Sequence, residues 1–366
     1  MRFDRRLITH FEWLLPLLAL AVAGLGAMTV YSGTHMPGSP GFSPLALRQL
    51  MWIGGGTVAM LLALLFDYRR LERSAFVVYV IVVLAVLAVP LVGRVGGGSR
   101  RWIPLGPVSI QPSEFMKIGL VIALARHFAR TYERRLGLRA ALLPAVMTAV
   151  PAALILAQPD LGSAAILAIV ALTMLLLGGI RLRWFVALAL IVAVAAPFAW
   201  PHLKGYQQKR ILTFIQPELD PLGAGYHVLQ SKIAVGSGMT WGKGFMRGTQ
   251  NHLNFLPEQH TDFIFSVFAE EWGFVGVLLL LALYLALVLR GIAIASHARD
   301  RFGVLLVLGV TCIVFWQAVI NVGMTTGLLP VVGIPLPLFS YGGSSVLCLL
   351  VGTGLAMNVS MRRYYF

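Results

Sequence analysis

The stretch Pro257–Gly273, PEQHTDFIFSVFAEEWG, joins the longest polar segment of the chain to a strongly apolar helix. Asp262 lies at this junction, two residues after His260. Glu270 and Glu271 follow about two helical turns later, at a depth in the membrane where a carboxylate is costly unless it is paired or used. The sequence therefore places any chemistry that the protein performs in this stretch.

The composition of the whole chain is that of a membrane protein. Of its 366 residues, 58% are hydrophobic and only 12% are charged, whereas a soluble domain carries about 25% charged residues. The net charge of +15 does not indicate binding of nucleic acid, because the basic residues are spread over short segments between apolar runs. We therefore expect an all-α polytopic integral membrane protein that forms a single domain over residues 1–366.

Ten apolar runs predict about ten transmembrane helices, since a helix needs about 20 residues to cross the bilayer. The first run lacks a convincing signal-peptide cleavage site, so we expect it to stay as the first span. The fifth and sixth runs are separated by Gln158-Pro159-Asp160, so they could also form one long helix and a re-entrant piece. The runs are 13–31, 50–66, 75–93, 113–128, 141–157, 161–179, 183–200, 263–289, 303–326 and 341–359.

The basic residues predict which ends of these spans face the cytoplasm. Short loops rich in lysine and arginine stay on the cytoplasmic side, and most of the 29 basic residues fall in alternate inter-span segments. This pattern places both termini in the cytoplasm and the long loop 201–262, between spans seven and eight, on the outer side. The basic segments are 2–6, 69–73, 126–139, 181–183, 290–301 and 362–363.

The long loop 201–262 has the character of a functional loop. It contains several aromatic residues and glycines and a helical pattern around 226–235, and a loop of this length is more often a lid or a binding element than a tether. Its basic residues include Lys209 and Arg210. They could contact acidic lipid headgroups or bind the phosphate of a substrate, and the loop alone favours neither interpretation.

Two further outward segments carry charged residues at helix starts. A glycine-rich segment with Arg101 leads into a helix whose first turns carry Glu114 and Lys117 on one face. Asp160 follows Pro159 at the start of another helix. A carboxylate that interacts with the helix dipole or pairs with a lysine explains these residues without any catalytic role, so both a structural and a functional interpretation stay open.

A third outward segment, 327–345, is apolar yet rich in glycine and proline. Irregular backbone of this kind must be buried in protein or line a cavity, because lipid cannot hydrogen-bond its amide groups. We expect a re-entrant loop that covers a pocket. Gln317 and Asn321, on one face of the preceding helix, are the residues expected to hold it by hydrogen bonds.

The residue types at these positions suggest two classes of function. Asp262 suits a general base that acts on a hydroxyl group, and nearby cations suit a phosphate or diphosphate leaving group. Together they fit an inverting glycosyl transfer from a lipid-linked sugar diphosphate. A transporter fits the composition equally well, because acidic residues within the membrane also serve as proton and ion relays. The histidines and cysteines show no metal-ligand spacing, so no metal site is expected.

The motifs of the chain, in order, are Arg101-Trp-Ile103, Gln111-Pro-Ser-Glu-Phe-Met-Lys117, Gln158-Pro-Asp-Leu-Gly162, Pro257-Glu-Gln-His-Thr-Asp-Phe-Ile-Phe265 and Pro335–Ser345. They resemble, over nearly the whole chain, the shape, elongation, division and sporulation (SEDS) family of bacterial peptidoglycan polymerases. Segments 217–227 and 248–250 resemble the family members that elongate rod-shaped cells more than those that act in division.

The resemblance implies a polymerase of the inner membrane with its active site on the outer side. It would join the disaccharide units of lipid II into β-1,4-linked glycan and release polyprenyl diphosphate. Its partners would be a class B penicillin-binding protein with transpeptidase activity, the elongation machinery and membrane lipids, and no nucleic acid. No cofactor is required, although a divalent cation could assist the diphosphate. A lipid II flippase and a scaffold for the penicillin-binding protein are the alternatives.

The resemblance also implies roles for single residues. Asp262 is the expected general base, and Glu114 and Lys117 match family positions near a central cavity. The remaining candidates for binding diphosphate or sugar are Arg101, Asp160, Lys209, Arg210, Glu258 and His260.

The two acids that follow Asp262 are expected to differ in role. Around a regular helix, Glu270 lies about 80° from Asp262 and Glu271 about 180° from it. We therefore expect Glu270 to flank the same cavity and Glu271 to pair with another helix.

Overall fold

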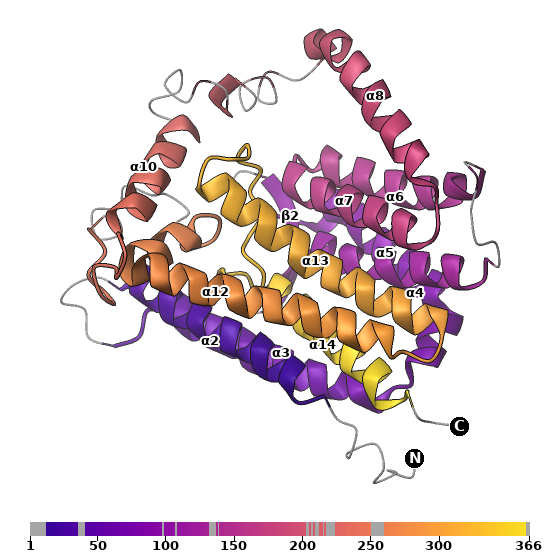
Figure 1. Cartoon of the computed structure of the whole chain (residues 1–366), viewed down its shortest axis with the longest axis horizontal. Helices are drawn as coiled ribbons and strands as arrows, with labels where there is room; N and C mark the ends of the chain where they lie inside the picture. Colours follow the sequence, from indigo (N-terminus) through magenta and orange to yellow (C-terminus); the bar gives the residue numbers. More distant parts are fainter. Residues whose placement is uncertain are drawn as a thin grey trace.

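The computed structural model of the chain describes residues 12–35, 41–96, 99–106, 108–131, 137, 139–202, 205, 208, 212–214, 216, 224–249 and 260–363. Within these residues, most of the chain is helical, and the long helices pack into a bundle (Figure 1). The predicted site residues Lys209, Arg210 and Glu258 lie outside the described residues.

Each of the ten apolar runs contains or overlaps a helix, and the number of these helices that span the membrane stays a prediction. The fifth and sixth runs form two separate helices rather than one long one. The helices are α2 (Leu14–Thr34), α3 (Pro44–Leu65), α4 (Tyr68–Val92), α5 (Pro112–Ala129), α6 (Arg139–Ala157), α7 (Leu161–Leu177), α8 (Leu182–Ala199), α12 (Ile264–Ser296), α13 (Arg301–Thr325) and α14 (Gly343–Met361).

The protein is a multi-span membrane protein. Among the described residues, 7 helices are long and apolar enough to cross a membrane, namely α2, α3, α4, most of α6, α12, α13 and α14. α7 and the apolar part of α8 are shorter, and α5 carries charged residues. Large apolar side chains are exposed along α4, α8 and α12, as expected for surfaces that face lipid.

The centre of the bundle is formed by α5, α13 and α14, whose residues are mostly buried. α3 packs along α14 through small residues that let the two backbones approach. A Cβ atom at Gly354 of α14 would lie 2.5 Å from the carbonyl oxygen of Met60 in α3. The glycine is therefore required for this contact between the two helices.

The described parts of the segments that the basic residues assign to one side of the membrane gather at one end of the bundle. Arg126 of α5 donates to the carbonyl oxygen of Arg73 at 2.6 Å, and Arg301 of α13 donates to that of Gly178 at 2.9 Å. The start of α2 and the end of α14 lie at this same end (Figure 1). The grouping of the segments thus agrees with the predicted topology, and the side of the membrane stays a prediction.

The structure adds one small feature to the predicted helical fold. The glycine-rich segment between α4 and α5 forms a small antiparallel sheet of β1 (Arg94–Gly96), β2 (Ser99–Leu105) and β3 (Val108–Ile110). Arg94 pairs with Trp102, and Ile103 pairs with Ile110. In a short connection between two helices, the backbone N–H and C=O groups have no helical partners, and a hairpin supplies hydrogen-bond partners for them. So short a sequence pattern does not predict this pairing.

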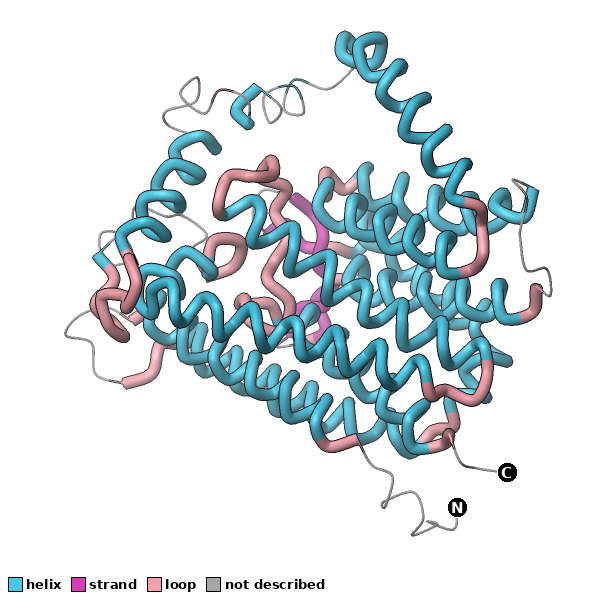
Figure 2. The backbone as a smooth tube through the Cα atoms, viewed as in Figure 1, coloured by secondary structure: helices cyan, strands magenta, loops and turns pink. Residues whose placement is uncertain are grey.

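The expected re-entrant segment is present between α13 and α14, where the backbone is irregular (pink in Figure 2). Its apolar residues Ile334, Leu336 and Phe339 are at most 2% exposed. Asn321 of α13 donates to the carbonyl oxygen of Ile334 at 2.7 Å, as expected. The Gln317 side chain makes no hydrogen bond among the described residues, so its predicted part in holding the loop is not seen.

The long loop contains the helical turn η1 (Trp200–His202) and the helix α10 (Ala224–Ser237). α10 covers the helical pattern expected around 226–235 and packs against α12 and α13. Ser231 of α10 donates to the carbonyl oxygen of Thr325 at 2.6 Å. Part of the loop is therefore a folded element that is docked on the bundle.

Gly354→Ala should destabilise the protein by about 1–3 kcal/mol, because the added methyl group forces the backbones of α3 and α14 apart. The melting temperature of the detergent-solubilised protein measures this loss. Gly55→Ala is the matched control, because a Cβ atom at Gly55 meets nothing within 4 Å. Equal melting temperatures for the two variants would contradict the close packing of α3 on α14.

Candidate functional site

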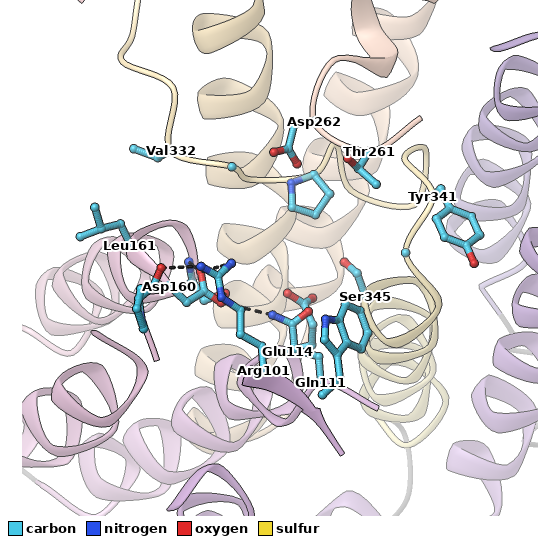
Figure 3. Close-up of a pocket in the computed structure, with 16 residues that line it drawn as sticks. Arg101, Gln111, Glu114, Asp160, Leu161, Thr261, Asp262, Val332, Tyr341 and Ser345 are labelled. Atoms are coloured by element: carbon cyan, nitrogen blue, oxygen red, sulfur yellow. Dashed lines mark hydrogen bonds and ion pairs between the residues drawn. The ribbon is translucent and has the colours of Figure 1, made fainter. Parts of the chain in front are cut away.

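A cavity of about 450 Å³ brings four separate parts of the chain together (Figure 3). They are β2 with the start of α5, the start of α7, the residues just before α12, and the re-entrant segment with the start of α14. A cavity of this size is in the range that holds a small-molecule ligand. Its polar lining side chains are Arg101, Gln111, Glu114, Asp160, Ser163, Thr261, Asp262, Tyr341 and Ser345.

Asp262 lies in the wall of this cavity, two residues before α12 begins. The re-entrant segment passes directly beside it, because a Cβ atom at Gly333 would lie 3.3 Å from Asp262 Oδ2. Gly333 has a φ of 74°, a left-handed conformation that favours glycine. The side-chain amide of Asn321 donates to the carbonyl oxygens of Asp262 at 3.0 Å and Ile334 at 2.7 Å. One buried amide therefore holds the aspartate and the segment beside it.

His260 lies next to the cavity but is not among the residues that line it. Its carbonyl oxygen accepts a hydrogen bond from the Tyr341 amide at 2.9 Å. The two rings lie 5.9 Å apart, and the Tyr341 side chain does reach the lining. The contact of His260 with substrate stays a prediction, and the His260 backbone ties the segment before α12 to the re-entrant segment.

Glu114 and Lys117 form a buried ion pair at the start of α5. Lys117 Nζ donates to both carboxylate oxygens of Glu114 at 2.8 Å, and the two residues are 4% and 2% exposed. Glu114 lines the cavity, whereas Lys117 does not. The predicted pairing of the two residues is therefore confirmed, and Glu114 also forms part of the cavity wall.

Asp160 combines two roles at the start of α7. It accepts hydrogen bonds from the Ser163 amide at 3.1 Å and hydroxyl at 2.8 Å, as an N-cap residue does. It also lines the cavity, where it accepts from Gln111 Nε2 at 3.2 Å. The nearest atoms of Arg101 and Asp160, Nη1 and Oδ1, lie 3.9 Å apart.

Arg101 is the cation of the described lining, and several acceptors hold it in place. Besides Asp160, it donates to the carbonyl oxygen of Gln158 at 3.2 Å and to that of Pro159. Its side chain keeps 30% of its surface exposed. The guanidinium group is thus oriented by β2 and the α6–α7 turn and remains accessible from the cavity.

The described lining is rich in carboxylates, hydroxyl groups and one amide, with Trp102 as an aromatic surface. Such side chains can donate to and accept from a ligand that carries several hydroxyl groups. Among the described residues, no group of three or more His, Cys, Asp or Glu could hold a metal ion. A divalent cation that is brought by a diphosphate substrate stays a prediction that this geometry does not test.

Sequence reasoning missed part of this lining. The residues that it did not select lie inside the quoted motifs, except Ser163, which directly follows one, so membership of a motif was the signal that could have found most of them. They are Trp102, Gln111, Ser163, Thr261, Tyr341 and Ser345.

Glu270 does not flank the cavity, so that expectation is wrong. It is 0% exposed and accepts a hydrogen bond from Lys243 Nζ at 2.6 Å. The regular-helix angle does not apply, because α12 begins only at Ile264 and leaves Asp262 outside the helix. Glu271 accepts from the hydroxyl group of Ser32 in α2, which confirms its expected pairing with another helix.

Comparison with known proteins gives a family match over almost the whole chain. Residues 12–365 match the family that is named for FtsW, RodA and SpoVE and described as "Cell cycle protein". The peptidoglycan glycosyltransferase MrdB of Escherichia coli is 39% identical over 97% of this chain and 94% of its own. A probable peptidoglycan glycosyltransferase FtsW of Trichlorobacter lovleyi is 37% identical over 96% of this chain and 94% of its own.

Solved structures share the fold. One is a chain described under "Structural coordination of polymerization and crosslinking by a peptidoglycan synthase complex", with a TM-score of 0.83 and 33% identity. The match covers 97% of this chain and 99% of that chain. The rod shape determining protein RodA of Thermus thermophilus has a TM-score of 0.71 and 30% identity, with 97% and 98% covered.

Lys117→Met should destabilise the protein by about 3–5 kcal/mol, because it leaves the buried Glu114 carboxylate without its counter-charge. The double variant Glu114→Gln/Lys117→Met should be more stable than this single variant, since it removes both charges. Thermal unfolding of the purified variants measures both effects. A Lys117→Met protein that melts at the wild-type temperature would contradict the buried ion pair.

Proposed function

The chain belongs to the SEDS family of FtsW, RodA and SpoVE, and from this premise we propose that it is a peptidoglycan glycosyltransferase. It joins the disaccharide-pentapeptide units of lipid II into β-1,4-linked glycan and releases polyprenyl diphosphate. The observation that carries this proposal is the position of Asp262, in the wall of a polar cavity built from four separate segments.

Asp262 acts as the general base. A hydroxyl group of the acceptor sugar attacks the anomeric carbon of the donor, and the Asp262 carboxylate accepts the hydroxyl proton. The bond between the anomeric carbon and the diphosphate oxygen breaks, so the configuration inverts and the diphosphate leaves with the electron pair. General-base catalysis contributes typically 10²–10⁴-fold to a rate. The location of Asp262 at the start of a span, rather than in its middle, suits this role better than that of a proton relay.

Arg101 stabilises the charge that develops on the leaving diphosphate. An oriented cation lowers the energy of a charged transition state without reorganisation during the reaction. The contacts of Arg101 with Gln158, Pro159 and Asp160 supply that orientation. Lys209 and Arg210 of the long loop are further cations for the diphosphate, and Glu258 is a further polar contact; these three assignments rest on the sequence.

The rest of the lining binds the sugar units. Trp102 presents an aromatic surface, and Glu114, Gln111 and Ser345 present acceptors and donors for hydroxyl groups. The Lys117 ammonium holds the Glu114 carboxylate in one orientation through two hydrogen bonds. The ion pair thereby keeps a fixed acceptor in the cavity wall.

The cellular role that we propose is elongation of the lateral wall in rod-shaped cells. It rests on segments 217–227 and 248–250 of the sequence and on the similarity to MrdB. The similarity to FtsW proteins is nearly as high, so a division-specific polymerase is the alternative. A knockout complemented by this chain distinguishes them, since rescue of rod shape supports the first role and rescue of septation supports the second.

The location and partners follow from the same premise. We place the chain in the bacterial inner membrane with its cavity on the outer side, because the basic segments lie at the opposite end of the bundle. The similar solved chain belongs to a complex that coordinates polymerization and crosslinking. A class B penicillin-binding protein that supplies the transpeptidase is therefore the proposed partner.

Asp262→Asn should reduce glycan synthesis from lipid II by at least 10²-fold, because the amide cannot accept the proton. The assay uses purified protein with its penicillin-binding partner and separates glycan products by gel electrophoresis. Asp67→Asn is the matched control: Asp67 caps α4 through the Arg69 amide at the other end of the bundle, and asparagine caps equally well.

Glycan of normal length and yield from Asp262→Asn would contradict the role of this residue. The same proteins in liposomes test the transport alternative with fluorescent lipid II. Transbilayer movement that persists in Asp262→Asn, without polymerisation by the wild type, would favour a flippase. Absence of both activities in the wild type, together with recruitment of the partner, would favour a scaffold.

A further inference from the structure

α12 is interrupted near its start. Gly273 has φ 64° and ψ −165° within an otherwise helical segment of 33 residues. The interruption separates a short first part, Ile264–Trp272, from the long second part of the helix. A helix that is broken in this way does not hold its two parts in line through its own hydrogen bonds. Other contacts must therefore set the position of the first part, which follows Asp262 directly.

A segment of the long loop fills the interruption. The amides of Phe274 and Val275 donate to the carbonyl oxygens of Met239 and Thr240 at 2.8 and 3.1 Å. In the other direction, the amides of Lys243 and Gly244 donate to the carbonyl oxygens of Glu270 and Glu271, both at 3.0 Å. Segment 239–244 thus supplies hydrogen-bond partners to the backbone on both sides of Gly273.

The fit between this segment and α12 depends on backbone-to-backbone contact. A Cβ atom at Gly242 would lie 2.1 Å from the carbonyl oxygen of Glu271, and one at Gly273 would lie 2.3 Å from the Gly242 amide nitrogen. Both glycines have positive φ, of 78° and 64°. These distances leave no room for side chains, so the loop segment and the helix fit together in one arrangement.

A buried ion pair joins the same two parts. Glu270 is 0% exposed, and its Oε1 accepts from Lys243 Nζ at 2.6 Å, from the Thr249 amide at 2.9 Å and from the Thr249 hydroxyl at 3.0 Å. A buried carboxylate is strongly unfavourable without such partners. All three of these donors come from the loop, so the charge of Glu270 binds the loop to the first part of α12.

A small movement of this first part would displace Asp262. The first part of α12 extends about 14 Å from Gly273 to Ile264 at 1.5 Å per residue, so a tilt of about 4° at Gly273 moves its start, and with it Asp262 two residues earlier, by roughly 1 Å. A misplacement of about 1 Å can reduce a rate about 10²-fold. The contacts that prevent this tilt therefore matter for catalysis even though they lie outside the cavity.

We propose that Lys243 and Glu270 are positioning residues, whose ion pair holds the first part of α12 and thereby keeps Asp262 in place in the cavity. This inference rests on the glycosyl transfer proposed above. The Asn321 amide holds the carbonyl oxygen of Asp262, and Ser32 holds Glu271. The ion pair adds a contact between the long loop and the first part of α12 to these contacts with α13 and α2.

The test compares Lys243→Met and Glu270→Gln with the wild type in the complex with its partner. Each variant should lower kcat for glycan synthesis about 10- to 100-fold and leave KM for lipid II within about twofold, because the variants misplace the base without removing a sugar contact. Lys243→Arg should restore most of kcat, because it keeps the charge. Arg247→Met, which removes an exposed cation from the same loop, should match the wild type.

Hydrogen exchange of the same proteins gives a readout that does not depend on activity. In Lys243→Met, the amides of residues 264–272 should exchange at least 10-fold faster, while those of 280–290 stay unchanged. Unchanged kcat and unchanged exchange would overturn the proposal. So would faster exchange in all helices with a general loss of stability, since that indicates a structural role alone. If the wild type makes no glycan, the proposed function fails, and local exchange still decides whether the ion pair holds this part of α12.

Discussion

The lipid interior offers no hydrogen bonds to a polypeptide, and this constraint shapes every irregular part of the protein. Backbone that leaves the helical pattern must find partners within the chain. For the re-entrant segment, these partners are the Asn321 side chain, the Tyr284 hydroxyl group and the backbone of His260. The Tyr284 hydroxyl group donates to the carbonyl oxygen of Pro337 at 2.7 Å. The interruption of α12 finds its partners in segment 239–244. The re-entrant segment lies beside Asp262, and the interruption lies in the helix that follows Asp262.

The same constraint governs the buried charges. Glu114 with Lys117, Asp160 with Arg101, and Glu270 with Lys243 each pair an acid with a cation, since an uncompensated charge is very costly at such positions. The three pairs serve different purposes. The first forms the cavity wall, the second orients a cation toward the cavity, and the third joins the long loop to the helix that follows Asp262.

Much of the fold follows from the sequence because its physics is local. A run of about 20 apolar residues favours a helix wherever it occurs, so each of the ten runs contains or overlaps a helix, and the described basic segments gather at one end. The small sheet between α4 and α5 was missed because its pairing, such as that of Ile103 with Ile110, depends on tertiary position rather than on pattern. The prediction for Glu270 was wrong because it counted a regular helical period from Asp262, although the residues before Ile264 are not part of α12.

The sequence by itself determined the membrane class, the helices, the family resemblance and the selection of Asp262, Glu114, Asp160 and Arg101, since each depends on local composition or on short motifs. Only the tertiary structure decided how these residues share one cavity, that the His260 carbonyl oxygen accepts a hydrogen bond from the Tyr341 amide, and that Glu270 pairs with the long loop. Their positions relative to one another depend on contacts between segments far apart in the chain. Periodicity and motif spacing do not predict such contacts. The contacts depend on the packing of helices and on the requirement that each buried polar group has a hydrogen-bond partner.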